Sequence, residues 1–255
     1  MSWGIRCRSA SGRWQINSDD DFACMQLAQK GQVTCGTNIG TNLGQWGGTI
    51  RTGSINYTGG QSPICVLRFP TVQTTSACGL LRQTFNGAGS WTFKPVVACG
   101  DNATLNGTLD YFIFDRPRPK SGFWGTRVKR NGALLYSSHQ PLMRVVDDMA
   151  VGPGAYSGTA GRSYAAAVTA KFESNADVEQ LTDMTWQTHW SSRLVGGRNT
   201  SGGFQIVEEL FADGQEDGAF DPGACVTDTG DSYWRDPQGG LYFLGQVLVV
   251  DVTDL

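Results

Sequence analysis

The feature of this chain that most constrains its fold is a short segment that occurs twice. The stretch W-G-I-R-C-R at residues 3–8 returns 121 positions later as W-G-T-R-V-K at residues 124–129. The two copies stay aligned as far as Asn17-Ser18 and Ser137-Ser138, with one residue lost at the turn. In the second copy, Asn131-Gly132 is the dipeptide favoured by a type I′ turn, because both central residues of that turn need a positive φ. The repeat therefore predicts a β-hairpin that is used twice.

Further strands are predicted from the alternation of apolar and polar residues. A strand is expected after each hairpin, over 22–27 and 142–146, so that a three-strand meander occurs twice. The other strands are predicted over 64–69, 109–114, 164–172, 186–194 and 204–210. Residues 241–252 are apolar on both faces, which favours a central strand covered on both sides. Pro95 places the strand over 91–97 at a sheet edge or at a bulge. Only the segment 177–184 has room for one or two helical turns.

Composition points to the same class of fold. Thirty-four Gly residues and only 17% charged residues suit many short strands joined by tight turns, so we expect an all-β chain of antiparallel β-sandwich type. The Pro-rich segment 115–122 is the best candidate boundary, which gives halves 1–118 and 119–255 as separate domains or as the two sheets of one sandwich. The Gly-, Thr- and Asn-rich stretch 34–61 is expected to be a long loop that an assembly orders.

Charge and cysteine usage exclude several classes of protein. With a net charge of −3 and no dense Lys/Arg cluster, the chain is not expected to bind nucleic acid. The basic segment 116–120 is interpreted first as a solvated linker, and the alternative interpretation is a contact with phosphate. Arginines near the N-terminus argue against a signal peptide, and the lack of an 18-residue apolar run argues against a membrane span. The cysteines lack a C-x-x-C pair and are interpreted as small buried hydrophobes in a reducing cytoplasm: Cys7, Cys24, Cys35, Cys65, Cys78, Cys99 and Cys225.

Catalytic and metal-binding motifs are weak. Residues 213–218 resemble a calcium loop, but Ala224 stands where a bidentate Glu is needed, so an acidic turn is the better interpretation. His139 and His189 have no nucleophile-elbow motif nearby. Pairs of carboxylates could serve a glycosidase, and the candidates are Asp147, Asp148, Glu208, Glu209, Asp228 and Asp231. We therefore predict no enzyme activity, no cofactor and no metal.

Aromatic residues offer one candidate ligand site. Trp186 and Trp190 fall on the apolar side of a predicted strand and are interpreted as core. Tyr233, Trp234 and Arg235 lie instead in a stretch rich in Asp, Pro and Gly, which is typical of a loop. A loop aromatic of this kind can contact a glycan, fold back over the core or become buried in a subunit interface.

The repeated hairpin also resembles a motif of small virion proteins in the tail tips and tail fibres of tailed bacteriophages. The matching residues are Trp3, Gly4, Ile5, Cys7, Gly12, Asn17 and Ser18, and then Trp124, Gly125, Val128, Gly132, Ser137 and Ser138. Strands over 111–115 and 248–253 are similar to the same pattern. Cys7 departs from it, since a β-branched residue is usual there. The resemblance implies a structural role in the virion, folding in the host cytoplasm, and no catalytic residues.

Three hypotheses of function follow. The first is a structural component of a tail tip, baseplate or tail fibre that assembles with other tail proteins and with copies of itself, using the 34–61 loop and the strand near Pro95. The second is a carbohydrate-binding module that contacts host surface polysaccharide through Tyr233, Trp234 and Arg235. The third is a polysaccharide-degrading enzyme with a pair of carboxylates.

Overall fold

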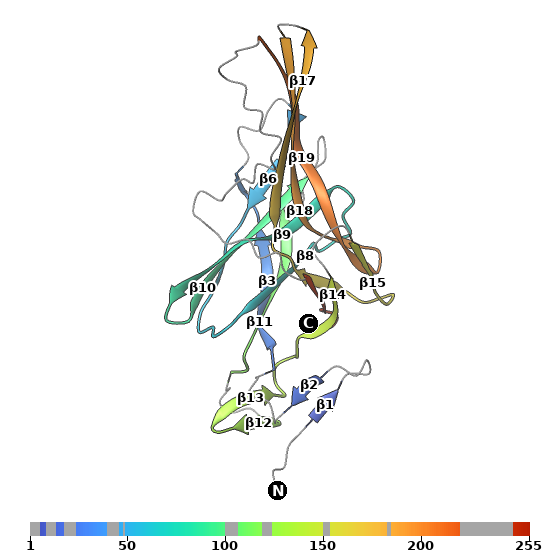
Figure 1. The fold of residues 1–255 in the computed structure, drawn as a ribbon. Helices are drawn as coiled ribbons and strands as arrows, with labels where there is room; N and C mark the ends of the chain where they lie inside the picture. The colour runs from blue at the N-terminus through green and yellow to red at the C-terminus, as the bar shows by residue number, and fades with distance from the viewer. Residues whose placement is uncertain are drawn as a thin grey trace.

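The structure is a computed structural model that describes residues 6–8, 14–17, 24–39, 46–47, 49–99, 107–118, 124–149, 154–182, 185–219 and 247–255. All regular elements in these ranges are β-strands, and all strand pairs among them are antiparallel. The all-β prediction is therefore confirmed. Figure 1 shows two large sheets, an arm of long strands above them and two short hairpins below.

The two large sheets have ten and six strands. The central path of the ten-stranded sheet is β15-β19-β18-β9-β10-β6-β4, with β17 on β18, β5 on β19 and β7 on β10. Its strands are β4 (Thr37–Asn38), β5 (Trp46–Gly47), β6 (Thr49–Thr52), β7 (Ile55–Tyr57), β9 (Ser76–Gly87), β10 (Ser90–Cys99), β15 (Gly154–Ser157), β17 (Lys171–Thr182), β18 (Thr185–Thr200) and β19 (Gly203–Ala219).

The six-stranded sheet has the order β14-β20-β16-β8-β11-β3. Its strands are β3 (Gln26–Thr34), β8 (Ile64–Arg68), β11 (Thr108–Asp115), β14 (Arg144–Met149), β16 (Tyr164–Ala167) and β20 (Val247–Asp251). The strand β20 lies between β14 and β16 with buried residues on both of its faces, as its apolar sequence predicts.

Side chains from both sheets share the same core, which makes the fold a sandwich. One buried cluster joins Leu67 and Ile113 of the six-stranded sheet to Phe93 and Val97 of the ten-stranded sheet. The outer face of the six-stranded sheet also carries buried apolar residues, among them Phe114. Apolar burial on this scale, at about 25 cal/mol for each Å², is the main favourable contribution to folding.

Both sheets draw strands from either side of residue 118. The boundary predicted between 1–118 and 119–255 therefore does not separate the two sheets. The predicted strand over 164–172 is divided instead. After β16 the chain leaves the six-stranded sheet, exchanges backbone hydrogen bonds between Val168, Ala170 and Leu80, and enters the ten-stranded sheet as β17.

The long loop predicted over 34–61 is wrong, because β4 to β7 lie within it. Ile50, Ile55 and Tyr57 of this segment are buried. The edge position predicted near Pro95 is also wrong, whereas the bulge is confirmed by a register shift between Lys94 and Pro95. On the other side of β10 the partner changes from β7 to β6 at this point, so that the missing N–H of proline interrupts no ladder.

The repeated hairpin is confirmed, as β1 (Arg6–Arg8) with β2 (Trp14–Asn17) and β12 (Arg127–Arg130) with β13 (Ala133–Ser137). Asn131 and Gly132 have φ of 48° and 83°, as the predicted type I′ turn requires. The meander is wrong, because β3 and β14 join the six-stranded sheet and leave each hairpin two-stranded. The helical turns considered for 177–184 are also wrong up to Thr182, since β17 pairs with β18 there.

An ion pair at the C-terminal end of β20 makes stability depend on pH. Asp251 is 4% exposed, pairs with Arg162 and accepts a hydrogen bond from the Thr253 N–H at 3.0 Å. Burial by itself raises the pKa of the Asp251 carboxyl. The hydrogen bonds from Thr253 and the charge of Arg162 outweigh burial, and they hold this pKa below its ordinary value.

We predict that Asp251→Asn weakens the loss of stability at acid pH. A lowered folded-state pKa contributes stability above the ordinary carboxyl value of about 4, and that stability is lost as the pH falls through the folded pKa. Urea unfolding at several pH values measures this. At neutral pH the free energy of unfolding of the variant is expected to be about 1 kcal/mol below that of the wild type. On acidification the variant is expected to lose less of its free energy of unfolding than the wild type does. The matched control is Asp254→Asn, since Asp254 is exposed and Asn tolerates its positive φ. Identical acid profiles for the wild type and Asp251→Asn contradict the prediction.

Candidate functional site

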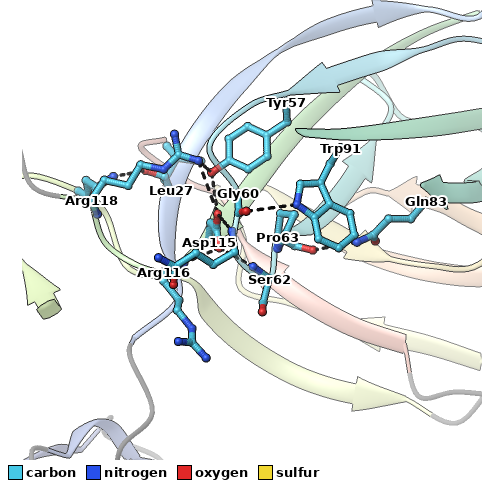
Figure 2. A network of polar contacts seen from close by, with 12 residues as sticks. Leu27, Tyr57, Gly60, Ser62, Pro63, Gln83, Trp91, Asp115, Arg116 and Arg118 are labelled. Carbon is cyan, nitrogen blue, oxygen red and sulfur yellow. Dashed lines mark hydrogen bonds and ion pairs between the residues drawn. The ribbon is translucent and has the colours of Figure 1, made fainter. Parts of the chain in front are cut away.

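A buried carboxylate ends β11 and organises the segment that leads to the second hairpin. Asp115 is 1% exposed and accepts four hydrogen bonds, which Figure 2 shows converging from separate parts of the chain. The donors are the Tyr57 hydroxyl at 2.9 Å and the backbone N–H groups of Gln61 at 3.0 Å, Ser62 at 3.0 Å and Arg116 at 2.8 Å. A buried charge needs such a set of donors, because desolvation otherwise makes it too costly.

Arg118 supplies the opposite charge. Its Nη2 lies 3.6 Å from Asp115 Oδ2 and donates to the Tyr57 hydroxyl, while the guanidinium carbon lies 4.7 Å from the centre of the Tyr57 ring. Burial, and then the hydrogen bond to Asp115, raise the pKa of the Tyr57 phenol. The phenol therefore stays protonated and keeps donating to the carboxylate. These contacts hold residues 115–118, directly after β11, in place.

A fully buried glutamine fixes the other end of the hairpin. Gln26 Nε2 donates to the carbonyl oxygens of Ser137 at 2.7 Å and Gln140 at 2.6 Å, and Gln26 Oε1 accepts from the Ser137 N–H at 2.9 Å. The Arg118 N–H donates to Gln140 Oε1 at 3.0 Å, which links this contact to the Asp115 network. The hairpin β12–β13 is thus joined to β3 and to the end of β11.

A serine and a histidine meet at the same place. Ser137 Oγ lies 2.5 Å from His139 Nδ1, a pairing that is seen in nucleophilic catalysis. Ser137 has no exposed surface, so its hydroxyl cannot reach a substrate in this conformation. The pair lies at the buried end of β13, so the surface of the hairpin that other molecules can reach is its outer face.

That outer surface carries an unusual side chain. Trp124, directly before the hairpin, is 95% exposed, while Val128 and Leu135 of the hairpin are buried. Arg127 and Lys129 are exposed on β12. We call residues 124–144 the anchored hairpin. It combines an exposed indole with exposed cations, and Trp and Arg are side-chain types that are enriched where proteins contact other molecules.

The residues predicted as a glycan platform, Tyr233, Trp234 and Arg235, lie outside the described residues, as do Asp228 and Asp231. The other candidate carboxylates are neighbours on single strands, with Asp147 and Asp148 on β14 and Glu208 and Glu209 on β19. Adjacent positions of a strand point to opposite faces, so Asp147 and Asp148 do not flank one bond. The acidic turn expected over 213–218 is wrong, because β19 is extended there and pairs with β18.

An aromatic pair that the sequence reasoning missed lies near the tip of the β9–β10 hairpin. Phe85 faces Trp91 across the two strands, with ring centres 4.9 Å apart, and Phe85 is 55% exposed. The signal was present in the sequence as Asn86-Gly87-Ala88-Gly89, a turn between two apolar strands. In the structure Gly87, Ala88 and Gly89 all have positive φ.

Five of the cysteines form no disulfide bond in the structure: Cys24, Cys35, Cys65, Cys78 and Cys99. Cys35, Cys65, Cys78 and Cys99 are buried and Cys24 is partly buried. Burial raises the pKa of the Cys35 thiol to about 12, and it also raises the pKa of the Cys65 and Cys78 thiols. Within the described ranges, no three His, Cys, Asp or Glu side chains lie close enough to hold a metal ion. The same part of the chain contains no helix with the length and apolarity needed to cross a bilayer.

Comparisons of the chain with protein-family models, with curated proteins and with solved structures found no match.

We predict that Asp115→Asn destabilises the fold by about 3 kcal/mol, because an amide cannot match four donors and leaves Arg118 without its counter-charge. The measurement is the urea midpoint together with amide hydrogen exchange in the hairpin, which should accelerate. Asp110→Asn is the matched control, since its pair with Arg68 at 3.3 Å is more exposed and is expected to contribute about 0–1 kcal/mol. Equal losses for the two variants contradict the role given to Asp115.

Proposed function

We propose that this protein is a structural component of a bacteriophage tail tip, baseplate or tail fibre, and that it acts through protein–protein contacts. The observation that carries the proposal is the anchored hairpin with Trp124 exposed on it. Leaving a large aromatic side chain in water forgoes the free energy of its burial, and interfaces are enriched in tryptophan for this reason. The resemblance of the repeated hairpin to virion proteins supports the same role.

The rest of the described structure suits a rigid building unit. Its buried polar side chains join separate strands: Asn199 accepts from the Phe69 N–H at 2.8 Å and donates to the Tyr164 carbonyl at 2.9 Å. In this way one side chain of β18 connects β16 and the residue that directly follows β8. Satisfied buried networks of this kind fix one arrangement of the core and rigidify it. Figure 1 shows β17, β18 and β19 extending beyond the sandwich as an arm, which offers further contact area.

Quantitative mass spectrometry of purified phage particles tests the proposal. We expect the protein in the particles at a fixed ratio to other tail proteins, and we expect Trp124→Ala to reduce its incorporation at least about tenfold while the free protein stays folded. Phe85→Ala, which removes an exposed aromatic at another surface, serves as the matched control. Particles that contain every other tail protein but lack this one contradict the proposal.

Carbohydrate binding at the host surface is a second candidate function, favoured by the exposed ring of Phe85 and the partly buried ring of Trp91 beside it. Aromatic faces next to hydroxyl and amide groups are common at polar ligand sites. Nearby, Asn86 Nδ2 donates to Thr92 Oγ1 at 2.8 Å, and this hydroxyl lies 3.2 Å from Asn56 Oδ1.

Retention on immobilised host polysaccharide separates the two aromatic surfaces. If the aromatic pair binds, Phe85→Ala should weaken retention at least about tenfold. If the predicted platform binds, Trp234→Ala should do so instead. Val72→Ala, which shortens another exposed apolar side chain, is the control. Retention that neither aromatic variant changes contradicts carbohydrate binding through these residues.

A further inference from the structure

The tip of the β9–β10 hairpin is built from two stretches of the chain that carry no charge. No Asp, Glu, Lys or Arg occurs over 52–67 or over 83–93. Strand register brings the two stretches together, because Trp91 of β10 lies opposite Phe85 of β9 on one side and Tyr57 of β7 on the other. Figure 1 shows this end of the hairpin projecting from the sandwich. The tip is therefore an outlying surface whose own residues are aromatic, hydroxyl, amide or small.

Phe85 is the exposed ring of this tip. It is 55% exposed, and the other large apolar side chains exposed in the described ranges lie elsewhere: Ile39, Val72 and Trp124. Beneath Phe85, the Trp91 ring packs against the core, with ring centres 4.9 Å apart and planes tilted by 49°. A single exposed ring covers far less area than a stable protein interface, which buries about 800 Å² on each partner. It matches the size of one sugar ring better.

The turn around Gly60 fixes the indole that supports Phe85. Trp91 Nε1 donates to the Gly60 carbonyl at 3.4 Å, as Figure 2 shows, and the Gly60 N–H donates to the Gly89 carbonyl at 2.7 Å. A Cβ on Gly60 would lie only 2.7 Å from the Tyr57 ring and 2.8 Å from the Trp91 ring, so only glycine fits there. A platform that is ordered before its ligand arrives loses less entropy on binding.

Uncharged hydrogen-bonding side chains border the two rings. Gln83 stands two residues before Phe85 on β9 and therefore shares its face. The Gln83 side chain is exposed, and its Nε2 donates to the Pro63 carbonyl at 3.3 Å, which places the amide beside the indole in Figure 2. Gln61 and Ser62, in the adjacent turn, are also exposed. A ring face with amide and hydroxyl groups beside it is complementary to a sugar, which has an apolar C–H face and a rim of hydroxyl groups.

The cations of β9 and β10 that come next along these strands lie on the opposite face. Lys94 pairs with Arg82 across the two strands. Phe93 is fully buried in the core, whereas its neighbour Lys94 is exposed, because adjacent positions of a strand point to opposite faces. An anionic group placed over Phe85 would give up its water without meeting a counter-charge on this face, and that desolvation is unfavourable. The aromatic face therefore favours an uncharged ligand.

We infer that this surface binds an uncharged polysaccharide, with one sugar ring stacked on Phe85 and with sugar hydroxyl groups bonded to Gln83 and to the turn over 58–63. The inference rests on carbohydrate binding, the second candidate function, and it adds the class of ligand at the aromatic pair. That class is a polymer of neutral hexose, deoxyhexose or N-acetylhexosamine units. The competing outcome is an acidic polysaccharide held by Lys94 and Arg82 on the opposite face.

Biolayer interferometry of the full chain on immobilised polysaccharides tests the inference. The probes are neutral polymers of glucose, mannose, galactose, rhamnose and N-acetylglucosamine, together with acidic polymers of uronic acids. We expect binding to at least one neutral polymer, with the same affinity at about 50 mM and about 500 mM NaCl, because salt screens contacts between charges and not the stacking of rings. We expect no binding to the acidic polymers.

Two substitutions of Phe85 give the sharpest measurement. Phe85→Leu keeps an apolar side chain but removes the flat ring, so it should weaken binding at least about tenfold, whereas Phe85→Tyr keeps the ring and should bind as the wild type does. Equal urea midpoints for the two variants show that the loss does not come from unfolding. Lys94→Gln, which removes the exposed cation from the opposite face, is the control and should leave binding to neutral polymers unchanged.

Three results overturn the inference: binding to none of the neutral polymers, equal affinity of Phe85→Leu and the wild type, and binding to acidic polymers alone. The last result leaves carbohydrate binding itself standing, and its loss in Lys94→Gln would assign it to the opposite face. Binding to no polymer of either kind contradicts carbohydrate binding as well. None of these results affects the proposed role in the virion, which the particle analysis tests separately.

Discussion

The buried carboxylate of Asp115 is the constraint on which the lower end of the molecule depends. A charge with so little access to water is stable only if donors surround it, and here those donors come from the chain after β7 and from the residue after Asp115 itself. Satisfying it therefore fixes two loops at once. Arg118 then lies within hydrogen-bonding distance of Tyr57 and pairs with Asp115, so that residues 115–118 are held at the end of β11.

The local parts of this arrangement were predictable from sequence. The Asn131-Gly132 turn needs no distant partner, since the two backbone conformations it requires are set by those residues alone. Strand positions such as 64–69 and 109–114 followed from alternation for the same reason. A pattern of period two records which face of a strand is buried, but it does not record which strand lies alongside.

The pairing of strands was therefore the part that could not be predicted. Alternation continues through Val168 and Ala170, yet the chain changes sheets there by bonding to Leu80, almost ninety residues earlier. In the same way, the segment 34–61 looked like a loop because Gly and Thr dilute its pattern, although β10 supplies the hydrogen bonds that make strands of 49–52 and 55–57. Such contacts between distant residues override local preference.

In the candidate site too, some features could be predicted from the local sequence and others depend on contacts between distant residues. Aromatic residues in polar stretches can be found by composition, but the exposure of Trp124 depends on how Gln26 and Asp115 hold the hairpin, and neither residue belongs to a motif. The basic segment 116–120 illustrates the limit well. In isolation it resembles a solvated linker, whereas in the structure Arg118 lies over the Tyr57 ring and pairs with a buried carboxylate. That ion pair, together with the hydrogen bond from the Arg118 N–H to Gln140, ties the end of this segment to the sheet and to the residues after the second hairpin, and the charge pattern of the sequence alone does not indicate either contact.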